Sequence, residues 1–259
     1  MQGVRMILLV VFGVGVVAGF VDAIAGGGGL IMLPGLMFTG LPVGSAIATN
    51  KLCGTFGSLT STLKFAQAQQ VNWRACVLMG PPILLGAYLG SRSIGLLPVA
   101  WAEPMVILLM VAITLFTVFR PDFGTAQRPT SEGISAGRGN GRDRIFWSVL
   151  AAIAIGFHDG FFGPGTGVFL VFTLLSLWPL DFLCATGTTK LLNFLANITA
   201  LITFAMNGTI VYSIGIFGAV GVILGSFLGA SFATSKGVKI IRPIFILVTS
   251  ALVIRLLVS

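Results

Sequence analysis

The sequence predicts an all-α polytopic membrane protein built from two homologous repeats. Three observations predict this class: an extreme composition, a series of long apolar runs, and rare charged residues that recur at a fixed spacing. Of the 259 residues, 56% are hydrophobic and 8% are charged, and the mean hydropathy is +1.04, which excludes a soluble domain. Because the runs are unbroken and do not alternate, we expect membrane helices and no β-barrel.

Eight apolar segments are long enough to cross a bilayer, which takes about 20 residues. They cover residues 4–24, 46–67, 71–92, 101–119, 144–161, 183–206, 209–232 and 239–258. The first segment has some features of a secretory signal peptide. Because residues 144–162 form its counterpart, including an aspartate, we expect it to remain as the first span.

Two further pieces, residues 26–44 and 163–181, open with glycine-rich runs and continue as short apolar helices near 30–40 and 167–177. Each helix rises roughly 16 Å, about half of a bilayer core. With the glycine run extended, the broken element crosses the core; the alternative is a re-entrant hairpin. In both cases the non-helical backbone needs protein or water as hydrogen-bond partners, so a binding cavity is expected.

The two halves of the chain match at two nearly equal offsets. An offset of 137 aligns Asp22 with Asp159, and an offset of 139 aligns Lys51 with Lys190. Aspartate and lysine are rare in this chain, so their alignment indicates a duplicated architecture, as in many transporters. Each half is expected to hold four long helices and one glycine-broken short or re-entrant helix.

The predicted organisation is a first repeat at 1–119, a flexible basic linker at 120–143 and a second repeat at 144–259. The linker is rich in Gly, Arg, Ser and Pro, a composition typical of flexible connections. The net charge of +8 lies largely in such segments between spans. It therefore indicates orientation signals and contact with anionic lipid, and no nucleic acid partner is expected.

The basic residues indicate an orientation. If both glycine-broken elements cross the bilayer, the halves are inverted, and nine basic residues collect on one side against three on the other. If both elements are re-entrant, the division weakens to eight against four. The positive-inside rule therefore favours the crossing arrangement, with the linker in the cytoplasm and both termini outside.

The glycine runs have the composition of an anion cradle. Glycine lets backbone N–H groups approach a ligand closely, and the helix that follows presents its positive N-terminal end. The alternative is that these glycines only permit close helix packing. The predicted cradle residues are Gly26, Gly27, Gly28 and Gly29 in the first half, and Gly163, Gly165, Thr166 and Gly167 in the second.

Two polar motifs open long spans and each ends in a lysine. A charge at that depth is costly and indicates a functional site, although helix capping by the hydroxyls and snorkelling of the lysines are alternatives. Asn193 and Asn197 follow Lys190 along one helical face, with Ser58 at the place equivalent to Asn197. The predicted substrate-binding residues are Thr49, Asn50, Lys51, Thr188, Thr189, Lys190, Asn193 and Asn197.

Asp22, Asp159 and His158, the only histidine, are candidates for proton coupling. A carboxylate in a cavity of low dielectric can take up and release a proton during transport, and histidine titrates near neutral pH. Alternatively, the aspartates hydrogen-bond the open N–H groups of the breaks or pair with the lysines. For His158, Val21 occupies the equivalent position, which favours a nonessential role.

The motifs resemble the TauE/SafE family of sulfite and organosulfonate exporters over almost the whole chain except the linker. They are GFVDAIAGGGGLIMLP and ATNK in the first half, and GFHDGFFGPGTG and ATGTTK in the second. The resemblance implies a secondary transporter in the bacterial inner membrane that exports sulfite, sulfoacetate or a related organosulfonate. Pro164 and Thr166 replace glycines of the first half, so one asymmetric central site is expected instead of two equal ones.

An anion channel, a membrane enzyme and a receptor subunit remain alternatives to the transporter. The sequence shows no metal-ligand spacing or triad-like arrangement, so we expect no catalytic residue, no metal and no cofactor. The expected partners are a small anionic substrate and membrane lipid. The exact substrate, the coupling ion and the oligomeric state are not encoded in these patterns.

Overall fold

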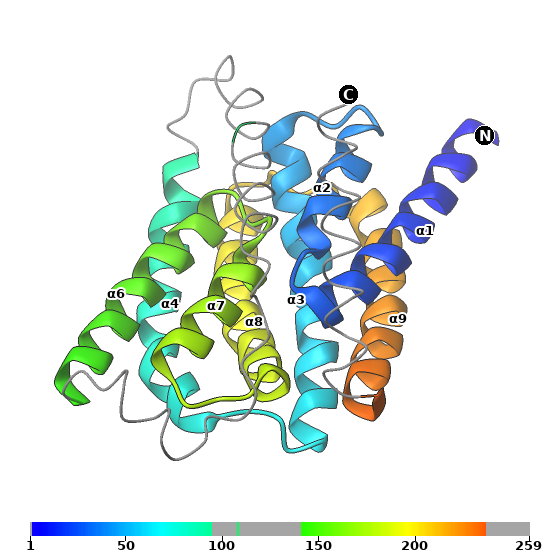
Figure 1. The fold of residues 1–259 in the computed structure, drawn as a ribbon. Helices are drawn as coiled ribbons and strands as arrows, with labels where there is room; N and C mark the ends of the chain where they lie inside the picture. The colour runs from blue at the N-terminus through cyan, green and yellow to red at the C-terminus, as the bar shows by residue number, and fades with distance from the viewer. Residues whose placement is uncertain (1, 95–107, 109–140, 237–259) are drawn as a thin grey trace.

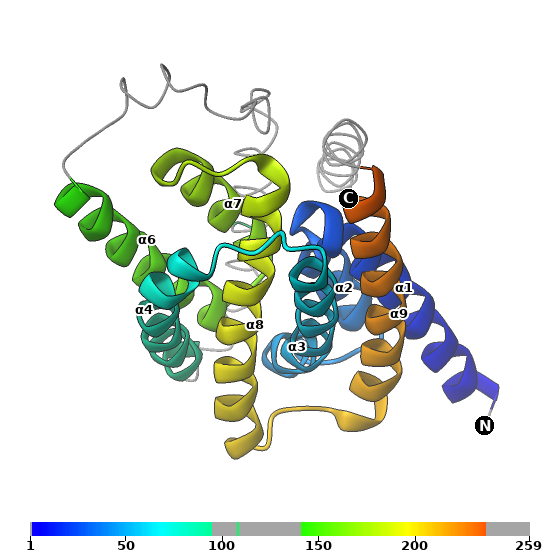
Figure 2. The same cartoon turned by 90° about the horizontal axis from the view of Figure 1, so that it is seen from below.

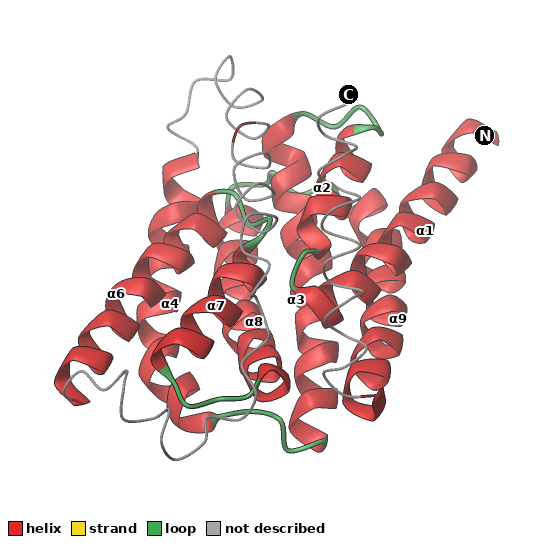
Figure 3. Ribbon diagram, viewed as in Figure 1, coloured by secondary structure: helices red, strands yellow, loops and turns green. Residues whose placement is uncertain are grey.

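The computed structural model describes residues 2–94, 108 and 141–236, and over these residues the regular structure is entirely helical, which confirms the all-α class (Figures 1 and 3). The expected spans at 101–119, apart from Leu108, and 239–258 lie outside the described residues. The helices are α1 (Gln2–Ala25), α2 (Gly28–Met37), α3 (Val43–Gln67), α4 (Trp73–Ser93), α6 (Gly141–Phe161), α7 (Thr166–Leu177), α8 (Phe182–Met206) and α9 (Tyr212–Lys236).

Helix boundaries follow local signals in the sequence. Asn72 and Asp181 cap α4 and α8, because each side chain accepts a hydrogen bond from a backbone N–H of the first turn, at 3.0 and 2.8 Å. The breaks after α1 and α6 contain glycines with positive φ, a conformation that other residues adopt only with strain. One boundary differs from expectation, since α6 begins at Gly141, inside the predicted linker.

Four of these helices are both long and apolar enough to cross a membrane: α1, α6, α8 and α9. Helices α3 and α4 are similarly long but less apolar. The reason in α3 is a row of polar residues that it buries, including Asn50, Lys51 and Thr55. Viewed from below, α3 and α8 lie in the middle, between the α4 and α6 pair on one side and the α1 and α9 pair on the other (Figure 2).

Glycines allow these outer pairs to pack with their backbones in close approach. A Cβ atom on Gly19 of α1 would lie 2.9 Å from the backbone nitrogen of Ser226 on α9. One on Gly86 of α4 would lie 2.7 Å from the nitrogen of Phe157 on α6. No larger side chain fits at such distances, so the small residues fix how closely the helices approach.

Each short helix folds back along the helix before it. At the start of α2, Gly28 lies against Asp22 of α1, and near its end Gly35 lies against Val14. Helix α7 returns along α6 in the same way, because the indole nitrogen of Trp178 donates to Ser148 Oγ at 3.2 Å. Each short helix therefore runs antiparallel to the helix before it and forms a hairpin with it (Figure 1). That the broken elements cross the bilayer stays a prediction.

A hairpin returns the chain to the side from which it started, as two crossings would, and the expected grouping of charge depends on this course of the chain. In Figure 1, α3 and α9 end, and α4 and α6 begin, at the lower end of the molecule. Among the described side chains, these helix ends carry four basic ones, Lys64, Arg74, Arg142 and Arg144. The upper end carries two, Arg5 and Arg92.

Candidate functional site

The two glycine breaks meet inside the molecule. Gly26 and Gly163 both have positive φ, +72° and +98°, which ends α1 and α6 at these points. A Cβ atom on Gly26 would lie 2.7 Å from the Cα of Gly167, and one on Gly29 would lie 3.1 Å from the Cα of Pro164. Backbone from opposite halves of the chain is therefore in direct contact, and glycine is required for this contact.

A cavity lies at this meeting point. About 40 Å³ of it is open to the centre of a water molecule, and since one water needs about 10–15 Å³ by this measure, there is room for about three. Helices α1, α2, α3, α6, α7, α8 and α9 and both glycine breaks contribute to its wall. The lining residues are Ala18, Asp22, Gly26, Gly28, Gly29, Met32, Asn50, Lys51, Cys53, Gly54, Gly57, Asp159, Gly163, Gly165, Gly167, Asn193, Asn197 and Val222.

Lys51 and Asp159 form an ion pair across the two halves, in the wall of this cavity. The ammonium nitrogen of Lys51 lies 2.7 Å from Asp159 Oδ2, and both side chains are 1% exposed. Gly163 lies directly beside this ammonium, because a Cβ atom on it would lie 2.7 Å from the nitrogen. The ammonium therefore sits against the left-handed turn that separates α6 from α7.

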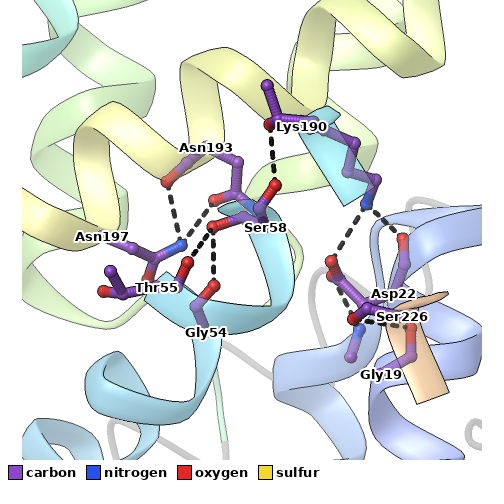
Figure 4. A network of polar contacts seen from close by, with 11 residues as sticks. Gly19, Asp22, Gly54, Thr55, Ser58, Lys190, Asn193, Asn197 and Ser226 are labelled. Atoms are coloured by element: carbon purple, nitrogen blue, oxygen red, sulfur yellow. Dashed lines mark hydrogen bonds and ion pairs between the residues drawn. The ribbon is translucent and has the colours of Figure 1, made fainter. Parts of the chain in front are cut away.

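Lys190 and Asp22 form the reciprocal ion pair. The ammonium of Lys190 lies 3.0 Å from Asp22 Oδ2 and also donates to the backbone carbonyl of Asp22 (Figure 4). The other carboxylate oxygen of Asp22 accepts from the backbone N–H of Gly28, at 3.2 Å. Lys190 is completely buried, as Lys51 nearly is, so neither lysine snorkels to the membrane surface.

Amide side chains complete the polar wall. Asn197 donates through Nδ2 to the backbone carbonyl of Asn193 at 2.9 Å and to its Oδ1 at 3.0 Å (Figure 4). Asn50 lines the cavity close to Gly29. Ser58, the counterpart of Asn197, instead donates to the carbonyl of Gly54, one turn earlier on its own helix, at 2.6 Å.

Several predicted binding residues are not among those that line the cavity. Thr49 accepts a hydrogen bond from the backbone N–H of Val211 at 3.1 Å, just before α9 begins. Thr188 accepts one from Asn72 at 2.9 Å, just before α4 begins. Each hydroxyl thus holds the backbone at the start of a different helix, α9 for Thr49 and α4 for Thr188. Gly27, Thr166, Thr189 and Lys190 are likewise absent from the lining.

The proton-coupling candidates are separated by the structure. Asp22 and Asp159 line the cavity and pair with lysines, which is the pairing alternative. His158 does not line it. Its ring lies edge-on to Phe162 and Phe169, and its Nδ1 lies 3.4 Å from the hydroxyl of Thr166. Among the described residues no cluster of three or more His, Cys, Asp or Glu side chains is arranged to hold a metal ion.

The sequence did not indicate all residues of the wall. Gly54 and Gly57 face the cavity, and Gly54 lies against the carboxamide of Asn197. They follow Asn50 at four and seven positions, and Cys53 follows it at three, so helical periodicity from this predicted residue is the signal that could have located them. Met32 and Val222 carry no such signal, because apolar residues are common throughout the chain.

Apolar helices around a buried polar cavity, with ion pairs at two helix breaks, are typical of a multi-pass membrane protein. The chain belongs to the family described as sulfite exporter TauE/SafE, whose sequence profile matches residues 11–256. This is a family of membrane transporters and not of enzymes.

Similar proteins span nearly the whole chain. A probable membrane transporter protein, ORF9, of a Sinorhizobium species is 36% identical over 93% of this chain and 88% of its own length. A probable membrane transporter protein of Haemophilus influenzae is 35% identical over 94% and 91%. The Escherichia coli protein YfcA, also a probable membrane transporter protein, is 32% identical over 97% and 90%. No solved structure matches the chain.

Proposed function

We propose that this protein is a secondary transporter that exports a small sulfur-containing oxyanion across the bacterial cytoplasmic membrane by alternating access. The observation that carries the proposal is the cavity at the meeting of the two glycine breaks, with Lys51 in its wall. Family membership supports the substrate class, since the family is described as sulfite exporters.

The chemistry of the wall suits an oxyanion. Lys51 supplies positive charge, Asn50, Asn193 and Asn197 supply amide groups, and α2 and α7 begin at the cavity. The first N–H groups of a helix lack intrahelical acceptors and favour negative charge. Room for about three waters suits sulfite, which has four heavy atoms, better than the longer sulfoacetate.

The two halves are proposed to be inverted repeats that move relative to each other. In support, the hairpin of α1 and α2 starts from the upper end of the molecule and that of α6 and α7 from the lower end (Figure 1). Each half also supplies one lysine and one aspartate, and each lysine pairs with the aspartate of the other half. Inverted repeats around a central site are the common basis of alternating access.

The lower end is proposed to face the cytoplasm, because it carries four of the six described basic side chains at the helix ends. To test this, Cys53, Cys76 and Cys184 are replaced, and single cysteines are placed at Arg5 and Lys64. A thiol reagent that cannot cross membranes should label position 5 from outside and position 64 only after lysis. The opposite pattern rejects the orientation.

Flux into proteoliposomes tests the function itself. Labelled sulfite, sulfoacetate, thiosulfate and sulfate are offered separately, with pH and voltage gradients imposed independently. We expect saturable uptake and counterflow of at least one of these anions, with sulfite preferred over sulfoacetate. A single-channel current without counterflow would establish a channel instead, and no flux of any of the four anions would reject the proposal. Lys64→Gln, on the same helix as Lys51 but in its last turn, is the control and should transport normally.

A further inference from the structure

The two reciprocal ion pairs have the same chemistry but different surroundings. Asp22 is held on three sides: the Lys190 ammonium contacts its carboxylate and its carbonyl, and the N–H of Gly28 donates to its second oxygen. Its carboxylate therefore caps α2 and, through Lys190, ties the hairpin of α1 and α2 to α8. The anion-binding end of α2 is thus already in contact with a carboxylate of the protein itself.

The pair of Lys51 and Asp159 is less completely engaged. Among the described residues, the hydrogen bond to Asp159 is the only one formed by the Lys51 ammonium, which has three N–H donors. Lys51 lines the cavity, whereas Lys190 does not. Gly163 beside the ammonium leaves it open to a group in the cavity, because no Cβ atom stands in between.

Resting on the proposed anion transport, we propose that Lys51 binds the transported anion directly and that Asp159 takes the anion's place when the site is empty. The pair of Lys190 and Asp22 remains closed throughout and fastens the first hairpin to α8. One oxyanion oxygen therefore replaces one carboxylate oxygen at the Lys51 ammonium, in a single central site.

This exchange has a consequence for protons. A displaced Asp159 is a buried carboxylate without its counter-ion, a state that costs far more than the neutral acid. The charged or titratable groups near it are Lys51, Asp22 and His158; α7 brings none, and α4 approaches α6 through glycines. Asp159 therefore takes a proton from water as the anion binds and returns it to water as the anion leaves.

Binding of labelled sulfite to purified full-length protein tests the assignment. Asp159→Asn removes the carboxylate that competes with sulfite for the Lys51 ammonium. Sulfite affinity should therefore rise by a factor of about 10 or more, which corresponds to the free energy of one hydrogen bond to a charged group. Lys51→Gln should remove detectable binding. Asp143→Asn on α6 and Lys64→Gln on α3 are matched controls that should bind as the wild type does.

Two double variants keep the test decisive if a single variant fails to fold, because each removes a whole ion pair and leaves no unpaired charge. K51Q/D159N should be folded and unable to bind sulfite. D22N/K190Q removes the contact that fastens the first hairpin to α8 and should still bind sulfite, in contrast to K51Q/D159N. Binding by the first and loss of binding by the second would overturn the assignment.

If the wild type binds none of sulfite, sulfoacetate, thiosulfate and sulfate, the transport proposal fails and this inference fails with it.

Discussion

The two glycine breaks begin from similar sequence and end with different structures. In the first half, the aspartate turns back onto the N–H of Gly28 and is held there by Lys190. In the second half, Asp159 points across to Lys51 at the cavity, and two glycines with positive φ, Gly163 and Gly165, surround Pro164. The comparison shows that two similar glycine-aspartate motifs can place one aspartate in a fully engaged contact and the other beside a cavity.

The largest expected effect is on stability, and it concerns the fastened pair. Lys190→Gln leaves the Asp22 carboxylate, which is 16% exposed, without a counter-ion, and this should lower the free energy of unfolding by up to about 3–5 kcal/mol. D22N/K190Q should recover most of this loss because neither charge remains. The measurement is thermal unfolding of the purified variants in detergent. Equal stability of the single and double variants would show that this ion pair does not stabilise the hairpin of α1 and α2.

The next effect concerns the open site. Gly163→Ala forces a Cβ atom to within 2.7 Å of the Lys51 nitrogen, at a φ of +98° that alanine adopts with strain. Sulfite flux should fall by a factor of about 100, corresponding to about 2.7 kcal/mol. Gly13→Ala, where a Cβ atom meets nothing within 4 Å, is the control. Normal flux in both variants would mean that the turn is not part of the site.

A third effect is a pH dependence that belongs to Asp159. If anion binding takes up one proton, sulfite affinity should fall by up to about tenfold for each unit that the pH rises. Sulfite also titrates, so the informative quantity is the difference between the wild type and Asp159→Asn. The slope should be smaller by one proton in the variant, and parallel slopes would contradict proton uptake by Asp159.

The smallest expected effect is on sulfite binding by the threonine variants, and it distinguishes a structural role of Thr49 and Thr188 from a substrate-binding role. Thr49→Val and Thr188→Val each leave a backbone N–H without its acceptor, and each should cost about 1–3 kcal/mol of stability. The KM for sulfite should stay within about twofold of the wild-type value, because neither hydroxyl lines the cavity. A large rise in KM at unchanged stability would instead support the sequence prediction of substrate contact.

Local physical chemistry allowed many features of this protein to be predicted from the sequence. An apolar run can only be a helix in lipid, a glycine run interrupts it, and a lysine at that depth needs a partner, so the helix positions, the breaks and the charged residues were all predicted. The resemblance in the motifs gave the family. The Pro164 and Thr166 substitutions also signalled that the two breaks differ.

Tertiary structure decided the direction of the short helices and the partners of the charges. Lys51 and Asp159 are 108 residues apart, and Lys190 and Asp22 are 168 apart, so no local pattern records either pair. The turn at each break depends on packing, since α2 and α7 gain contacts by folding back on α1 and α6. Residue types determined that charge is buried; the packing of distant helices determined which aspartate neutralises which lysine, and which of the two lysines faces the cavity.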